Sequence, residues 1–555
     1  MLRGFSDHLL AALICALFFI ISLQPQGRAQ SIAPVSSTEA VGWREDLRFM
    51  AQEIPKRHKN LFHTMTREQF EAAIKRLDER IPALARHQII VEMARIVAQV
   101  GMIGDGHTSL PLVPPPHEGA PFKIGFRQYP LKLYLYSDGL FVQSAASECA
   151  PVVGARVVKI GQASAEQAFK AASEIVSRDN EMTPTDRVPP LLTIPEVLHA
   201  LGLIENMEKA RFTFQSGGKE TTLELSPVAD ARKIKWVDAR ESASPAPLWL
   251  KDPHNNYWFE YLTGSRTLYF RYKGVSDNPS GESLRDFFKR LFAFIEEHAV
   301  DRLVIDMRLN RGGNAVLSWP LIYGIIRSDK INQKGKLFTI IGRETFSAGS
   351  QTAAWLGLHT RMTFVGEPTG GGVNVYGNHV SIVLPRSGIE VFVSPYYFQN
   401  TYPWDERPWI APHITAELSS EDYRRNNDPA LSAILKYQPI AEIMTAALSE
   451  GGAELMLKRY LEFKSSPPTA SINTEEEVNA LGYELIGRGR FREAIEVFKL
   501  NVKSYPLSAN AYDSLGDAYS RSGDKEQAIK AYEKALELNP ASSDTAEKLR
   551  RLRSR

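Results

Sequence analysis

The chain has 555 residues, of which 43% are hydrophobic and 23% are charged, and its formal net charge at pH 7 is +2. This length exceeds the need of one domain, and the composition is that of an ordinary globular protein. A nearly balanced charge argues against a dedicated nucleic-acid-binding protein, which normally carries a basic excess. We therefore expect several globular domains and no nucleic-acid partner.

The N-terminal segment has the layout of an export signal. Arg3 precedes an apolar run over residues 9–23, and small residues stand at Gly27 and Ala29. This pattern is typical of a secretory signal peptide, and the run is short for a membrane-spanning helix, although a retained anchor stays open as the alternative. We predict a signal peptide over residues 1–29, a periplasmic or secreted protein, and no stable membrane span after cleavage. Cleavage would leave Cys149 without a partner for an intramolecular disulfide.

Residues 40–115 are predicted to be an N-terminal helical region. Apolar residues recur at spacings of three and four in the stretches 44–54, 67–81 and 87–101, which favours amphipathic helices. The segment GDGHTSL, residues 104–110, then interrupts this pattern with glycines. Most of the 12 histidines are expected to be ordinary core or surface residues, but His107 stands in this non-periodic loop, where a side chain can face a cleft.

The region 120–235 is predicted to be rich in strands. Two short alternating runs flank a Ser-Asp-Gly turn at residues 137–139, a pattern typical of paired strands.

Residues 255–440 read as an α/β domain. A strand near 267–275, an amphipathic helix over 282–298 and a buried strand over 301–310 follow each other, and the last runs into Gly312 and Gly313. Strands that alternate with helices indicate an α/β architecture. The glycines suit either a tight turn or backbone donors for a developing oxyanion.

Ser347 follows the apolar run 336–341 and precedes a helix-like run over 352–358. Serine is a favoured N-cap residue, so this position fits a helix cap. A strand that leads through small residues into a helix also suits a nucleophile, which needs a base, an orienting group and an oxyanion site. The spacing alone leaves both interpretations open.

The tail, residues 473–555, contains a repeat. Residues 473–506 align with residues 507–540, with ALGYEL over SLGDAY, REAIEVF over EQAIKAY and a proline at the end of each repeat. A period of 34 residues with this pattern is that of a tetratricopeptide repeat. Two repeats are few for independent stability, so residues 543–555 are expected to add a closing helix. Such arrays usually hold a protein partner.

Five motifs in order carry a family resemblance: GDGHTSL, VIDMRLNRGGN, GRETFSAG, FVGEPTGGG and WDERPWIAPHI. Over residues 40–435 the chain resembles the tail-specific or C-terminal processing serine peptidases, and most closely their tricorn-like branch. The resemblance implies a crotonase-like α/β core with a serine peptidase site that hydrolyses peptide bonds. The strand-rich region also faintly resembles the PDZ-like module of these peptidases, which would either capture a peptide end by strand addition or be a structural insertion.

The resemblance assigns the nucleophile and the oxyanion hole. Ser347 matches the nucleophile, and Ser350 is the poorer candidate. The amide of Ala348 and one of Gly312 or Gly313 match the oxyanion-hole donors.

The resemblance also assigns the base. In one branch the base is a lysine at the place of Gly372, which excludes a serine–lysine pair here. In the tricorn-like branch it is a histidine, matched by His107, with Glu406 as its orienting acid. The serine that precedes the histidine in that branch is replaced by Gly106, so Asp105 or Thr108 would have to substitute, or Glu406 would contact His107 directly.

Three functions follow as hypotheses. The first is an exported serine endopeptidase that acts on a peptide or protein substrate, with a repeat-built docking domain. The second is a catalytically inactive protein that binds an apolar ligand or a peptide, and the third is a scaffold built on the repeats. No metal is expected, because spacings such as His-Glu-x-x-His are absent from the sequence, and no cofactor motif is visible.

Overall fold

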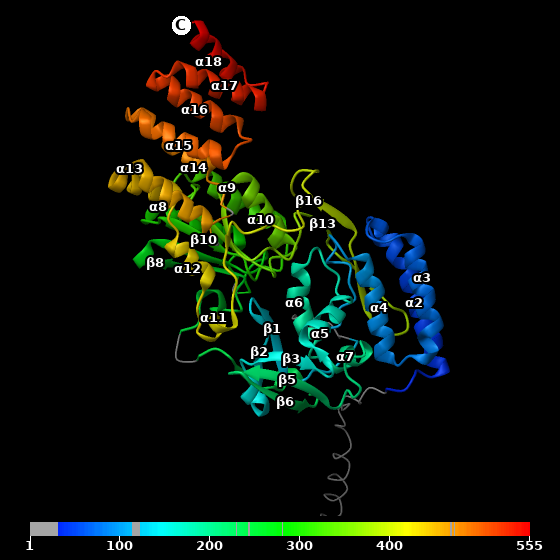
Figure 1. Cartoon of the computed structure of the whole chain (residues 1–555). Coiled ribbons are helices and arrows are strands. Elements are labelled where there is room, and N and C mark those ends of the chain that lie inside the picture. Colours follow the sequence, from blue (N-terminus) through cyan, green and yellow to red (C-terminus); the bar gives the residue numbers. More distant parts are fainter. Residues whose placement is uncertain are drawn as a thin grey trace, which may run out of the picture.

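A computed structural model describes residues 32–113, 123–228, 230–241, 245–279, 281–466, 469–470 and 472–554 (Figure 1). The signal peptide predicted over residues 1–29 lies outside these residues. In the part of the chain that the structure describes, no helix is long and apolar enough to cross a membrane.

The three helices expected near the N-terminus are present. They are α2 (Ser37–Arg57), α3 (Arg67–Arg80) and α4 (Arg86–Val100). Ser36 and Thr66 begin the first two with capping boxes, in which a side chain accepts from the N3 amide and receives a reciprocal bond. After α4 the chain leaves the helical conformation at Gly101, and the loop that carries His107 follows.

The next region is a mixed layer of strands and helices. The sheet has the order β1-β2-β3-β5-β6, with β4 beside β3 and β7 beside β2. Its strands are β1 (Leu131–Tyr136), β2 (Gly139–Ala146), β3 (Arg156–Ile160), β4 (Ala163–Ser164), β5 (Ala210–Ser216), β6 (Lys219–Leu225) and β7 (Trp236–Asp238). Three helices that the strand pattern did not indicate lie between β4 and β5: α5 (Ala165–Ser173), α6 (Met182–Leu191) and α7 (Pro195–Ala200). Sequence reading missed α6 because Pro189 and Pro190 stand inside it.

The predicted alternation of strands and helices downstream is confirmed. The strand order is β17-β12-β11-β10-β9-β8, and all neighbours are parallel except β8 and β9. The strands are β8 (Tyr257–Leu262), β9 (Thr267–Tyr272), β10 (Arg302–Asp306), β11 (Leu337–Ile341), β12 (Thr363–Gly366) and β17 (Ile414–Thr415), and the helices between them are α8 (Leu284–Glu297), α9 (Trp319–Arg327) and α10 (Ala348–His359). β9 and β11 are buried along their whole length, as expected for strands covered on both faces.

Two short antiparallel strand pairs follow β12 in the chain and lie beside the N-terminal helices. They pair β13 (Asn374–Gly377) with β16 (Tyr396–Gln399), and β14 (Val380–Val383) with β15 (Glu390–Val393). Ser109 forms an antiparallel bridge with Phe392 of β15 through two backbone hydrogen bonds. The loop that carries His107 is therefore hydrogen-bonded to β15, which follows the central strands of the α/β sheet in the sequence.

The C-terminal part is helical, as the repeat predicts (Figure 1). It comprises α11 (Ser420–Arg424), α12 (Pro429–Lys436), α13 (Ile440–Ser465), α14 (Glu475–Gly487), α15 (Phe491–Ser504), α16 (Ala509–Ser522), α17 (Lys525–Leu538) and α18 (Ser543–Ser554). In each repeat a glycine lies against an aromatic ring: a Cβ on Gly482 would meet Phe498, and one on Gly516 would meet Tyr532. One buried cluster joins α13–α17 to Tyr269, Val304 and Phe338 of the sheet.

Candidate active site

Ser347 lies at the junction of β11 and α10 and holds a strained backbone conformation. Its φ is 53° and its ψ is −126°, a region that residues with a Cβ rarely occupy. Ser347 is the N-cap of α10, yet its side chain makes no capping hydrogen bond. Its Oγ instead lies 3.0 Å from Nε2 of His107. The hydroxyl is thus held toward a histidine rather than toward the helix that it begins.

The imidazole of His107 is fixed by stacking. Its ring centroid lies 4.6 Å from that of Phe346, at an interplanar angle of 26°. Nδ1 is buried and has no hydrogen bond of acceptable geometry among the described residues. The backbone of Tyr376 in β13 interacts with the ring and raises the pKa of His107, against the larger effect of burial. With Nε2 facing the Ser347 hydroxyl, the proton of a neutral imidazole belongs on Nδ1.

Burial lowers the pKa of His107 to about 4, from an ordinary value near 6.5. The charge of Asp105 opposes this shift, whereas the positive charge of Arg187, and that of His379 when it is protonated, add to it. His107 is therefore neutral at pH 7 and able to accept a proton from Ser347.

Asp105 is buried and held by three donors. His58 Nε2 lies 2.7 Å from Oδ2, and the Ser394 hydroxyl and the Thr108 amide donate to Oδ1 over 2.6 and 3.0 Å. Because the Asn60 amide donates to Nδ1 of His58, the His58 proton lies on Nε2 and points to Asp105. Burial alone would raise the pKa of Asp105, but these hydrogen bonds lower it to about 2. A permanent negative charge thus stands two residues before His107.

Two backbone amides at the site, one in the glycine turn after β10 and one at the start of α10, have no acceptor among the described residues. The Gly312 amide donates to Oδ1 of Asn310 over 3.0 Å. Among the described residues, the amides of Gly313 and Ala348 have no acceptor. Gly312 has φ of 113°, and a Cβ on it would lie 2.7 Å from Cβ of Ser347, so only glycine fits this close approach.

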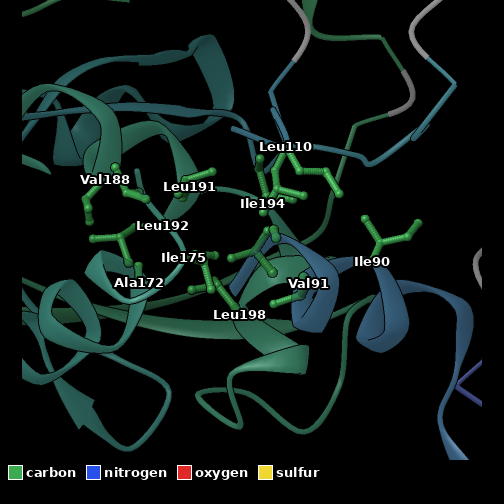
Figure 2. Close-up of a cluster of buried hydrophobic side chains, with 14 of the residues drawn as sticks. Ile90, Val91, Leu110, Ala172, Ile175, Val188, Leu191, Leu192, Ile194 and Leu198 are labelled. Atoms are coloured by element: carbon green, nitrogen blue, oxygen red, sulfur yellow. The ribbon is translucent and has the colours of Figure 1, made fainter. Parts of the chain in front are cut away.

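A cleft of about 630 Å³ opens beside the pair of Ser347 and His107. Its walls come from the His107 loop, the segment 175–191, the glycine turn and the hairpin of β14 and β15. Leu110, Ile175 and Leu191, which line the cleft, belong to the hydrophobic cluster in Figure 2. The other apolar lining residues are Pro111, Leu112, Val113, Val176, Pro190, Phe346 and Phe392.

The remaining sequence-predicted residues lie apart from the reacting pair. Glu406 is exposed, and its side chain has no hydrogen bond or ion pair among the described residues. Thr108 uses its hydroxyl to accept from the Ser394 amide. Ser350 is buried and donates to the Thr345 carbonyl over 3.0 Å. The structure thus brings Ser347 and His107 together and leaves Glu406 outside.

Sequence reasoning missed a charged segment that contacts the loops of the site. Asp179 accepts from the amides of Gly106 and Gly372, over 2.6 and 3.3 Å. Arg187 donates to the Gly106 carbonyl over 2.8 Å. No sequence signal could have found these contacts, since 73 and 81 residues separate the partners of Gly106 from it.

Comparison with known proteins agrees with this architecture. A model of peptidase family S41 matches residues 322–416, and a tetratricopeptide repeat model matches residues 509–542. No curated protein matches the sequence.

Solved structures resemble the chain at low identity. Mature CPAF has a TM-score of 0.50 and 12% identity, over 76% of this chain and 99% of that chain, which supports a shared fold. Mature CPAF complexed with lactacystin has a TM-score of 0.49 and 12% identity, over 76% of this chain and 100% of that one. The photosystem II D1 C-terminal processing protease has a TM-score of 0.32 and 14% identity, over 72% and 97%. The α/β core is therefore similar to peptidase family S41 over residues 322–416, which supports a serine-type peptidase, and the tail matches a tetratricopeptide repeat over residues 509–542.

Proposed function

We propose that the protein is an exported serine endopeptidase of the branch that uses histidine, with Ser347 as nucleophile and His107 as general base. The observation that carries this proposal is the 3.0 Å approach of Ser347 Oγ to His107 Nε2, two atoms whose residues are 240 positions apart. A nucleophile and a base within hydrogen-bond distance are the geometric signature of covalent catalysis. Export is supported by the composition of residues 1–29.

The reaction begins with proton transfer. His107 takes the proton of the Ser347 hydroxyl while Oγ attacks the scissile carbonyl, and the same proton then passes to the leaving amine. Water hydrolyses the resulting acyl-enzyme by the reverse sequence. A base whose pKa lies near 4 is weak, so the imidazolium formed during the reaction needs a compensating charge. The ionised Asp105 is the acid whose charge raises the pKa of His107.

The tetrahedral oxyanion is stabilised by backbone donors. The free amides of Gly313 and Ala348 flank Ser347, and Gly313 also lines the cleft. Ala348 is the first residue of α10, so the partial positive charge at the helix N-terminus adds to the hydrogen bonds. The Gly312 amide already donates to Oδ1 of Asn310, so it is not an oxyanion donor. Gly312 instead lets the turn approach Ser347 closely, because it has no side chain.

The cleft indicates which substrates fit. Its lining is mainly apolar, and its volume of about 630 Å³ accommodates more than one side chain. We therefore propose that peptides with large apolar side chains beside the scissile bond are preferred, and that the repeats bind a protein partner or the substrate itself.

Cleavage of an unfolded polypeptide tests the proposal. Reduced and alkylated casein is incubated with the wild type, with Ser347→Ala and with Ser350→Ala as the matched control, and the products are sequenced by mass spectrometry. We expect new termini next to large apolar residues with the wild type and the control, and none with Ser347→Ala. Equal cleavage by Ser347→Ala would overturn the assignment. No cleavage by the folded wild type, with saturable binding of an apolar dye in the cleft, would favour the binding protein.

A further inference from the structure

We propose that Asp179 and Arg187 form a charged clamp on the peptide group of Gly106, and that this clamp positions His107 in place of an acid bonded to its ring. The inference rests on the proposed role of His107 as base. Both Asp179 and Arg187 are positioning residues that bind the backbone next to the base, and Arg187 also lines the cleft.

The clamp holds the Gly106 residue at both of its polar groups. Oδ1 of Asp179 accepts from the Gly106 amide over 2.6 Å, and Nη1 of Arg187 donates to the Gly106 carbonyl over 2.8 Å. Both contacts are buried or partly buried. Because the Gly106 carbonyl belongs to the peptide that leads into His107, fixing it fixes the start of the His107 side chain.

Arg187 also closes a stack on the ring of the base. Its guanidinium carbon lies 4.8 Å from the centroid of Phe346, and Phe346 stacks on His107. A Cβ on Gly106 would lie 2.9 Å from the Phe346 ring and 3.2 Å from Oδ1 of Asp179. The residue before His107 is therefore glycine because the clamp and the stack occupy the space of a side chain.

The segment around Asp179 also forms hydrogen bonds with the loop that follows β12. Oδ2 of Asp179 faces the amide of Gly372 at 3.3 Å. Asn180 donates to the carbonyls of Thr369 and Pro408, and Thr183 donates to the carbonyl of Gly370. Asp179 thus binds both Gly106 and Gly372. In the peptidases that the chain resembles, these two positions hold the relay serine and the catalytic lysine.

The electrostatics of the clamp give it a measurable signature. Burial raises the pKa of Asp179 to about 7, and the charge of Asp105 adds to the rise, against hydrogen bonds from Gly106 and Gly372 and the charge of Arg187. Both carboxylate oxygens of Asp179 accept from backbone N–H groups. Protonation of Asp179 would direct its new O–H toward one of these N–H groups, and the repulsion would weaken the clamp. As pH rises through about 7, Asp179 ionises and the clamp tightens.

Arg187 has a second signature. Its positive charge lowers the pKa of His107, in addition to the larger effect of burial. Removal of this charge stabilises the imidazolium, so the pKa of His107 rises in Arg187→Met. This shift shows that the charge of Arg187 reaches His107, and the loss of kinact shows whether Arg187 also positions the ring.

The test uses the full chain with ¹⁵N-labelled histidine and a fluorophosphonate probe. The pKa of His107 is read from its imidazole resonances, assigned by their loss in His107→Gln, and kinact and KI of the probe are measured from pH 4 to 9. In Arg187→Met we expect a higher pKa of His107 and a kinact lower by about 100-fold, the order expected when a catalytic group is displaced by ~1 Å. Arg187→Lys restores the pKa but not kinact, because it keeps the charge and loses the planar stack.

Asp179→Asn tests the other half of the clamp. In the wild type, kinact is expected to rise between about pH 6 and pH 8, as Asp179 ionises. In Asp179→Asn this rise, the limb near pH 7, should be absent, while KI changes by less than about twofold. The limb should persist in Glu344→Gln, because Glu344, whose pKa burial also raises to about 7, ion-pairs with Arg311 and does not contact Gly106. Arg178→Met is the matched control on the same segment, since Arg178 pairs with Glu181.

The outcomes separate this inference from the proposed function. If the wild type takes no probe at Ser347, the proposed function fails, while the His107 resonances still report on the clamp. An unchanged pKa of His107 in Arg187→Met, or losses of kinact in Arg178→Met equal to those in Arg187→Met, would overturn the clamp.

Discussion

At the scale of single residues, the side chains of the site depend on unusual backbone positions. Ser347 is held at φ of 53°, which points its hydroxyl away from the helix that it caps and toward His107. Such strain persists only where neighbours enforce it. Here the carbonyl of Asn310 accepts from the Phe346 amide and Gly312 packs against Cβ of Ser347. The strain is therefore maintained by the loops around the nucleophile.

Gly106→Ser would restore the serine that the resemblance leads one to expect, yet we predict a loss of function. The new Cβ would meet the Phe346 ring at 2.9 Å and Asp179 at 3.2 Å. Overpacking of this kind costs about 1–3 kcal/mol of stability, and the displaced His107 should slow fluorophosphonate labelling about 100-fold. Thermal unfolding and labelling rates measure the two effects. Faster labelling in Gly106→Ser would show that the serine relay is compatible with this site.

Glu406→Gln tests whether Glu406 orients His107, as the family resemblance implies, or plays no part in catalysis, as its exposed position in the structure indicates. Because Glu406 is exposed and unpaired among the described residues, we expect kcat/KM to stay within about twofold of the wild type. The measurement is hydrolysis of casein at pH 7.5. A loss of 100-fold or more (on the order of ~3 kcal/mol) would instead mean that Glu406 moves to His107 when substrate binds.

The sequence identified Ser347 and His107 but not the residues that hold them in place. Ser347 and His107 were found because their motifs resemble those of known peptidases. Asp179, Arg187 and Phe346 were not, because their roles come from contacts across 73 or more residues and from ring stacking, which leave no local pattern. Glu406 was assigned from motif position alone, and position in the sequence does not determine whether an exposed loop reaches the imidazole.

At the scale of elements, the turn between β10 and α9 shapes the oxyanion site. Asn310 is fully buried; its Oδ1 accepts from the Gly312 amide, and its Nδ2 donates to the Tyr272 carbonyl. The turn and the N-terminus of α10 meet where the carbonyl of Asn310 accepts from Phe346. The sequence predicted the strand and the glycines here, but it could not say which glycine amide is free.

Asn310→Ala is predicted to loosen this turn. Each buried polar group left without a partner costs about 1–3 kcal/mol, so the midpoint of thermal unfolding should fall, and kcat should fall more than KM changes because the Gly313 donor acts in the transition state. Asn314→Ala is the matched control: Asn314 is exposed, and among the described residues its side chain accepts only from the Val316 amide. Equal effects of the two variants would contradict the role given to Asn310.

At the scale of the whole molecule, the first repeat is part of the peptidase core. Val478, Leu481 and Leu485 of α14 are buried in the same cluster as Phe338 of β11. Burial of each such side chain contributes about 1.5–3 kcal/mol, against a total stability of about 5–15 kcal/mol for a domain. The repeat pattern predicted the helices, whereas their fusion to the sheet depends on α13, whose role the sequence did not show.

Two truncations test this fusion. A chain that ends at residue 472 loses the whole contribution of α14 and α15 to the cluster, so we expect aggregation or a much lower unfolding midpoint. A chain that ends at residue 506 loses only Leu515, Ala518 and Ala531 from the cluster and should stay folded. Light scattering and thermal unfolding distinguish them. Equal stability of both truncations would show that the repeats are an independent domain.

Fluorophosphonate labelling at pH 7.5, read by intact mass and by peptide mapping, tests the roles of Ser347 and His107 together. We expect one adduct on Ser347, no adduct in Ser347→Ala, and labelling slower by about 100- to 10,000-fold in His107→Gln. At this pH His107 is neutral, because its pKa lies near 4, so its imidazole can accept the proton of Ser347. An adduct at another residue, or labelling in His107→Gln as fast as in the wild type, would contradict the account.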